Sequence, residues 1–215
     1  MRGQETPEKP REDLTDKVFR VGGELAYIVL MSVVWIVMSI PVITLPAATV
    51  GVHATLVSHI ADGNREYLRP FWQGFRTSFR GTTLPGLALV LLTGLCAFNS
   101  YFYAGARSTT GLSISLAVVQ AVLASALLVI TTYYFALRGA FSARDGSGGW
   151  PGIRAAVMTA RRHWAASLAV LTFSLGVPAA MAWLGLWQFS LFILGTLSYF
   201  NVRILNRAKV WEVRP

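Results

Sequence analysis

Long apolar stretches alternate along this chain with short segments that carry nearly all of its charged side chains. Five of these stretches hold about 20 residues or more, the length at which an α-helix crosses a hydrocarbon core about 30 Å thick. We expect transmembrane helices at residues 22–42, 83–104, 111–137, 164–184 and 185–205. The first of them is longer than the h-region of a cleaved signal peptide, about 7–15 residues, so we expect it to stay in the membrane.

A sixth apolar stretch, residues 46–60, is short and contains His53 and His59, so hydropathy alone leaves it undecided. Lys and Arg near helix ends favour the cytoplasmic side of a membrane. If this stretch crosses and the N-terminus is inside, the inner segments carry 18 of the 19 Lys and Arg residues, and Arg107 alone lies outside. Without this crossing, a group of four arginines beginning at Arg65 would lie outside. The charges therefore favour six crossings.

The pattern as a whole predicts an all-α membrane protein with one transmembrane domain of six helices, residues 22–205. Cytoplasmic tails are expected at residues 1–21 and 206–215, so both termini are cytoplasmic. The composition agrees, because 54% of the 215 residues are hydrophobic and only 13% are charged, whereas a soluble domain carries about 25% charged residues. A single cysteine, Cys96, excludes a disulfide scaffold, and the hydrophobicity excludes disorder. A nucleic-acid partner is not expected despite the net charge of +9.

The inner segment before the 83–104 crossing has aromatic and basic stripes at helical spacing, which predict an interfacial helix at residues 69–80. The residues of this surface are Arg69, Phe71, Trp72, Phe75, Arg76, Phe79 and Arg80. We expect the rings to enter the acyl region and the guanidinium groups to reach lipid phosphates. Two interpretations stay open: a connector that contacts only lipid, and a docking surface for a cytoplasmic partner protein.

A second amphipathic helix is expected on the inner face at residues 151–163. Ile153, Val157 and Ala160 share one side of it, and Arg154 and Arg161 share another. This pattern also predicts a helix at the membrane interface.

Polar residues inside the predicted crossings are the candidates for interhelical hydrogen bonds, with a solute path as the alternative. They are His53, Asn99, Gln120 and, nearer the outer end, Gln188. No charged side chain is predicted near the middle of the membrane, which weakens the case for an ion-coupled carrier. His53 and His59 are six residues apart on a helix and face about 120° apart, so a shared metal site is not expected.

Charged residues at the inner helix ends are expected to reach solvent or the lipid headgroups. Glu24 has Arg20 one turn before it, and we expect these two side chains to pair. Arg138 and Arg203 lie at inner ends, where long basic side chains extend to the headgroups. A stripe of small residues from Ser113 to Ser125 suits close helix packing, within the bundle or in a homo-oligomer.

Catalytic motifs are not found in the sequence: it contains no H-E-x-x-H, no Walker lysine loop and no G-x-S-x-G elbow. We therefore expect neither enzymatic activity nor a cofactor or metal. An enzyme acting on lipid or glycan is the least favoured class, because no acid–base pair is visible.

The order of features over residues 17–85 resembles the YesL-like family of bacterial integral membrane proteins. The similarity lies in Trp35, in the turn Pro41-Val42-Ile43-Thr44, in the small-residue helix that follows, and in Phe71-Trp72-x-x-Phe75-x-x-x-Phe79. The resemblance implies a bacterial plasma membrane and genes usually found beside carbohydrate ABC importers. It implies no established catalytic residues, so the matched positions, Trp35, Pro41 and Thr44 among them, are expected to be architectural.

The resemblance, together with the amphipathic pattern on the inner face, leads us to expect a non-enzymatic accessory component of a carbohydrate ABC importer. Its inner amphipathic helices would contact the permease or the ATPase of the importer, and the lipid bilayer would surround the rest. The alternative is an independent small-solute transporter or channel, with a polar path near His53, Asn99 and Gln120.

Overall fold

A computed structural model of the chain describes residues 14–64, 66–105, 111–141, 150–186 and 190–210. Every secondary-structure element in these residues is helical, which confirms the all-α class. The elements are α1 (Leu14–Ser39), the short 3-10 helix η1 (Val42–Thr44), α2 (Leu45–Asp62), α3 (Leu68–Ala104), α4 (Gly111–Phe141), α5 (Trp150–Arg162), α6 (Trp164–Trp183) and α7 (Ser190–Arg207).

Five segments among the described residues are long and apolar enough to cross a membrane. They lie in α1 from Gly22, in η1 and α2 over Val42–Ile60, and in α3, α4 and α6. The crossing predicted at residues 185–205 corresponds to α7, which is not among the five. The C-terminal half of α7 contains Asn201, Arg203, Asn206 and Arg207, which lower its mean hydropathy.

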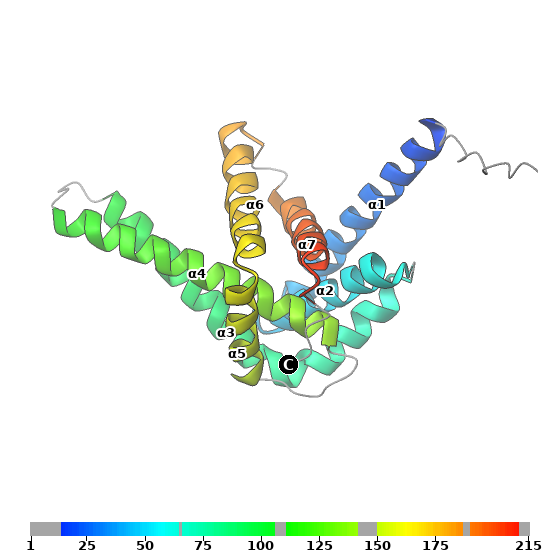
Figure 1. Cartoon of the computed structure of the whole chain (residues 1–215), viewed down its shortest axis with the longest axis horizontal. Coiled ribbons are helices and arrows are strands. Elements are labelled where there is room, and N and C mark those ends of the chain that lie inside the picture. Colours follow the sequence, from blue (N-terminus) through cyan, green and yellow to red (C-terminus); the bar gives the residue numbers. More distant parts are fainter. Residues whose placement is uncertain (1–13, 65, 106–110, 142–149, 187–189, 211–215) are drawn as a thin grey trace, which may run out of the picture.

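The short helix α2 lies at the centre of the fold, where it packs against α1, α3, α4 and α7 (Figure 1). Half of its candidate span, 50%, is buried inside the protein, whereas the other four spans are 11–28% buried. This burial places the short helix inside the bundle of helices. Burial by neighbouring helices also explains how a helix too short for the full bilayer avoids mismatch with lipid.

Glycines at the crossing points bring the backbones of α2, α3 and α4 together. A Cβ added at Gly74 of α3 would lie 2.7 Å from the Cβ of Ala54. A Cβ added at Gly139 of α4 would lie 2.7 Å from both the backbone nitrogen of Ala54 and the Cβ of His53. Small residues allow such close approach between membrane helices.

The predicted interfacial helix and the third crossing form one continuous helix, α3, of 37 residues. Figure 1 shows that α3 changes direction along its length. Pro85 lies inside this helix; its ring clashes with the carbonyl of the residue four positions earlier, here Gly81, and it has no N–H to donate. The structure therefore has one bent helix where the sequence predicted two elements.

The helix ends farthest from the centre of the fold diverge, with the α3–α4 hairpin, α6 and the N-terminal end of α1 pointing in different directions (Figure 1). Large apolar side chains on the hairpin are exposed, among them Leu95, Phe98, Val118 and Val122. A helix that is apolar on its exposed faces requires a non-aqueous surrounding. Lipid provides that surrounding in a membrane.

Candidate functional site

The turn between α1 and α2 holds two residues of the family-like motif, Pro41 and Thr44. The Thr44 hydroxyl reaches the carbonyl of Met38 and, at 2.6 Å, the carbonyl of Pro41. The Thr44 backbone N–H also donates to the Pro41 carbonyl, at 2.8 Å. These bonds satisfy a carbonyl that the C-terminal end of α1 leaves unpaired and close the turn into α2. Both residues lie where an architectural role requires them.

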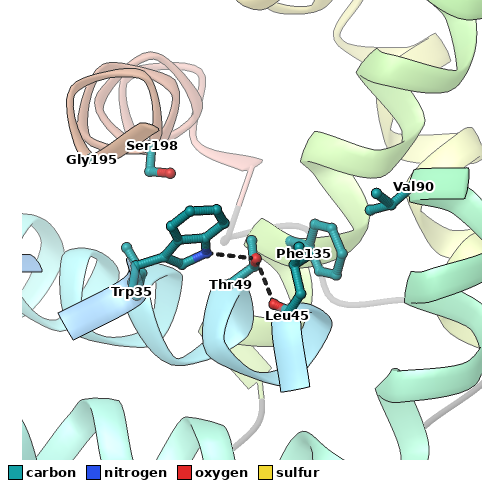
Figure 2. Close-up of a pocket in the computed structure, with 8 residues that line it drawn as sticks. Trp35, Leu45, Thr49, Val90, Phe135, Gly195 and Ser198 are labelled. Atoms are coloured by element: carbon teal, nitrogen blue, oxygen red, sulfur yellow. Dashed lines mark hydrogen bonds between the residues drawn. The ribbon is translucent and has the colours of Figure 1, made fainter. Parts of the chain in front are cut away.

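Trp35 connects α1 to α2 through its indole N–H. Its Nε1 donates a hydrogen bond to the Thr49 hydroxyl at 3.0 Å, and that hydroxyl donates to the Leu45 carbonyl at 2.8 Å. Figure 2 shows this chain of two bonds beside an interior cavity. His53 adds a further contact one turn along, since its Nδ1 lies 2.8 Å from the Thr49 carbonyl.

The cavity beside Trp35 has a volume of about 280 Å³ and lies where five helices meet. Its lining residues are Trp35, Leu45, Thr49, Val52, Val90, Phe135, Gly195 and Ser198. Most of this wall is hydrocarbon, and the Trp35 N–H is already bonded to Thr49. A sugar placed here would lose water around its hydroxyl groups without gaining matching partners, at a cost in free energy. The cavity therefore suits an apolar occupant rather than a carbohydrate.

The polar residues expected inside the membrane are not gathered into one path. His53 is buried against Gly139 near the C-terminal end of α4, and Gln120 precedes Gly139 by 19 residues on the same helix. That separation is about 28 Å along the helix axis. Asn99 lies on the same distal part of the hairpin as Gln120, since the neighbouring Ser100 hydroxyl donates to the Ala117 carbonyl at 2.9 Å.

Gln188 lies outside the described residues. Among the three candidates that are described, the structure thus brings Asn99 and Gln120 to one hairpin and leaves His53 with α2.

A polar cluster joins the N-terminal part of α1 to the C-terminal part of α2. The Glu24 carboxylate Oε1 lies 3.4 Å from Nε2 of His59, and the imidazole ring of His59 stacks on Tyr27 with 4.4 Å between ring centroids. Tyr67 completes the aromatic group, 5.0 Å from Tyr27. Arg20, the partner that the sequence predicts for Glu24, has its side chain outside the described residues.

This cluster was missed by reasoning from the sequence, although one signal pointed to it. Glu24 is the one acidic residue within the six predicted crossings, and an acid in an apolar helix needs a partner. Tyr199 of α7 packs in the same core cluster as Tyr27, and Arg203 Nη1 donates to the Tyr199 hydroxyl at 3.5 Å. The helix that supplies the partner of Glu24 could not be predicted, because it depends on tertiary packing and not on a local sequence pattern.

The aromatic stripe on the N-terminal half of α3 faces two different surroundings. Phe71 is only 3% exposed and lies against Gly51 of α2. The expectation that the Phe71 ring enters lipid is therefore wrong. Phe75 is half-buried and stacks on Trp72, with 5.6 Å between centroids. Trp72, 54% exposed, and Phe79 remain on the surface. The stripe therefore anchors α3 to α2 at one end and presents rings to the outside at the other.

The basic stripe of the same segment is exposed along its length. Arg69, Arg76 and Arg80 all lie on the surface, and Arg69 Nη1 is 3.8 Å from the Glu66 carboxylate. Both members of that pair are largely exposed, so the pair contributes little to stability. The three arginines and Trp72 form what we call the α3 basic face.

The second predicted amphipathic helix is present as α5. Its apolar side packs inward, with Ala156 fully buried and Ile153 and Ala160 against the same core cluster. Its Arg154 and Arg161 side chains are exposed. An ordered break at His163 separates α5 from α6.

Arg138 is a buried residue at the junction of α3, α4 and α5, and the expectation that it reaches the headgroups is wrong. Its side chain is 6% exposed, and its Nε donates to the Thr82 hydroxyl at 3.2 Å. The Cβ position of Gly152 lies 3.7 Å from Arg138 Cδ, so α5 covers it. A polar partner on α3 and a small residue on α5 together accommodate the guanidinium group inside the protein.

Metal chemistry has no visible basis in the described residues, where no three His, Cys, Asp or Glu side chains lie close enough to bind one ion. His53 and His59 have different neighbours, the Thr49 carbonyl and the Glu24 carboxylate.

The helices described above are those of a multi-pass α-helical membrane protein, by length and composition. Residues 25–100 match the family model described as "Protein of unknown function, DUF624", over about a third of the 215 residues. The match runs from α1 through α2 into α3 and includes Trp35, Pro41 and Thr44. DUF624 is the family of the YesL-like proteins, which agrees with the resemblance carried by those residues. No curated protein and no solved structure matches the chain.

Proposed function

We propose that this chain is a YesL-like protein of a bacterial plasma membrane that acts, without catalysis, as an accessory component of a carbohydrate ABC importer. It crosses the membrane six times, with α7 as the sixth crossing and both termini in the cytoplasm. The α3 basic face, on the cytoplasmic side, docks on the permease or the ATPase of the importer.

The exposure of the α3 basic face is the observation that carries this proposal. Arg69, Arg76 and Arg80 lie at the surface beside the exposed Trp72, while Phe71 fixes the same helix to α2. Trp and Arg are enriched in the parts of protein interfaces that contribute most to binding. A rigidly held helix with such a face loses little conformational entropy when it docks.

The interior supports an accessory role better than a role as a sugar carrier. The cavity of about 280 Å³ beside Trp35 is lined mostly by hydrocarbon. His53 of α2 lies against Gly139, which is 19 residues from Gln120 along α4, so His53 and Gln120 do not line one polar path. The importer itself, and its carbohydrate cargo, rest on the family resemblance alone, since the matched family model is described only as a protein of unknown function.

Co-purification in mild detergent tests the proposal. Tagged protein is expressed from its native host with the neighbouring importer, and the recovered permease and ATPase are quantified by mass spectrometry. We expect the triple variant Arg69→Gln, Arg76→Gln, Arg80→Gln to lose the importer. The matched control, Arg203→Gln, Arg207→Gln, Lys209→Gln, removes the same charge from exposed positions at the C-terminal end of α7 and should retain it.

Recovery of the wild-type protein alone, with sugar uptake unchanged when its gene is deleted, would reject the accessory role. Solute flux through liposomes that contain only this protein would instead favour the independent transporter.

A further inference from the structure

A groove of about 400 Å³ lies between α4, α5 and α6, on a different part of the molecule from the α3 basic face. Its volume falls within the range of about 300–1,000 Å³ typical of small-ligand pockets. The groove is lined by Ser125, Ala126, Val129, Ile130, Val157, Ala160, Arg161, Trp164, Ser167, Leu168 and Leu171.

The polar and apolar parts of this lining are separated along the groove. Arg161 and Trp164 stand at the end where α5 meets α6, and both are exposed. Leu171 lies seven residues after Trp164 on α6, about 10 Å deeper. Trp prefers the boundary between headgroups and acyl chains, so the Arg161 end sits at that boundary and the Leu171 end within hydrocarbon.

The two hydroxyl groups of the lining, those of Ser125 and Ser167, are already bonded within the protein, and Ser125 Oγ donates to the Ala121 carbonyl at 2.8 Å. Ser167 Oγ donates to the Ala160 carbonyl at 2.9 Å and lies 3.1 Å from the Tyr133 hydroxyl. The wall below Arg161 therefore offers a ligand mainly hydrocarbon contacts.

The charge at the mouth of the groove is positive and has no acidic counterpart on the helices that form it. Helices α4, α5 and α6 contain no Asp or Glu, and Arg161 is the charged residue of the groove lining. A guanidinium group is well suited to bind phosphate, through two parallel hydrogen bonds. A ligand that fits both ends has one anionic phosphate group joined to an acyl chain.

We propose that this groove is a binding site for an anionic phospholipid of the bilayer, with an acyl chain along α4 and α6 and the phosphate group at Arg161. The site stands apart from the importer proposal, because it uses neither the α3 basic face nor a partner protein. Binding there would hold the junction of α5 and α6 against α4.

Native mass spectrometry of the purified full-length protein tests this site, with phosphatidylglycerol added to detergent micelles and phosphatidylcholine as the neutral comparison. We expect Arg161→Gln to weaken phosphatidylglycerol binding by about tenfold, the loss of one charge-assisted contact. Arg162→Gln removes the same charge one residue away, outside the groove lining, and should change binding by less than about twofold.

A second variant tests the groove without altering charge. Ala126 is exposed on the groove wall, so Ala126→Phe should fill the groove and displace the acyl chain while the fold is kept. We expect phosphatidylglycerol binding to fall at least fivefold, consistent with lost apolar burial. Equal losses for Arg161→Gln and Arg162→Gln, unchanged binding to Ala126→Phe, or equal binding of both lipids would each overturn the proposed site.

Discussion

The indole nitrogen of Trp35 and the hydroxyl of Thr49, 3.0 Å apart, join α1 to α2 at the wall of the interior cavity. The same hydroxyl is bonded to the Leu45 carbonyl, so Thr49 acts as both donor and acceptor. Together with the Thr44 turn, this pair fixes the angle at which the chain enters the central helix. This hydrogen bond explains why a Trp at position 35 and a Thr at position 49 suit the fold.

Thr49→Val should destabilise the protein by about 1 kcal/mol, because the Trp35 N–H loses its acceptor in a largely apolar surrounding. Unfolding in sodium dodecyl sulfate, followed by tryptophan fluorescence, measures the change. The control is Thr93→Val on α3, whose hydroxyl, within the described part of the chain, bonds only to the Leu89 carbonyl of its own helix, at 2.7 Å. Equal effects of the two substitutions would contradict a specific role for the Trp35–Thr49 bond.

Gly139→Ala should destabilise the protein by about 1–3 kcal/mol, the usual effect of overpacking. The added methyl group would lie 2.7 Å from the Ala54 backbone nitrogen, so α2 and α4 must move apart. Gly94→Ala is the matched control, since nothing lies within 4 Å of a Cβ there. Thermal unfolding of both variants in the same detergent gives the comparison, and an unchanged midpoint for Gly139→Ala would argue against this close crossing.

His59 contributes both a ring and a polar contact, and two substitutions separate these contributions. His59→Phe keeps the stack on Tyr27 and loses the contacts of the ring nitrogens with the Glu24 carboxylate and the Asn64 carbonyl, whereas His59→Ala loses the stack as well. We expect His59→Ala to cost about 0.5–1.5 kcal/mol more than His59→Phe, the usual worth of an aromatic pair. A double-mutant cycle with Glu24→Gln then measures the polar coupling. A coupling energy near zero would mean that Glu24 and His59 are neighbours without mutual stabilisation.

The apolar pattern predicted most helices closely, because crossing the hydrocarbon core sets a minimum length that can be counted. Helices α4 and α6 begin at Gly111 and Trp164, as predicted. The pattern failed where a helix continues past the apolar run: α3 joins the segment predicted at residues 69–80 to the crossing predicted from residue 83. Hydropathy marks where an apolar run begins, and it does not show whether the helix also continues into the polar segment before it.

The candidate sites were less predictable, because a helical stripe locates a face and does not reveal what covers it. Phe71 and Arg138 were both expected at the lipid boundary, and other helices bury both. Small residues opposite them, Gly51 and Gly152, are the signals that could have indicated this. The partner of Glu24 lies 35 residues away, which only tertiary packing determines.

The side of the membrane on which the α3 basic face lies can be tested by cysteine labelling. Cys96 is buried, so Cys96→Ala gives a background without cysteine. In that background Arg76→Cys, at an exposed position, should resist a membrane-impermeant maleimide in intact cells and react after lysis. The charge distribution predicts this result, because a topology of six crossings would place 18 of 19 basic residues inside. Arg107→Cys, in the predicted outer turn, should react with the same maleimide in intact cells. Labelling of position 76 from outside would remove residues 45–62 from the set of true crossings, and a cytoplasmic docking role for the α3 basic face would then be impossible.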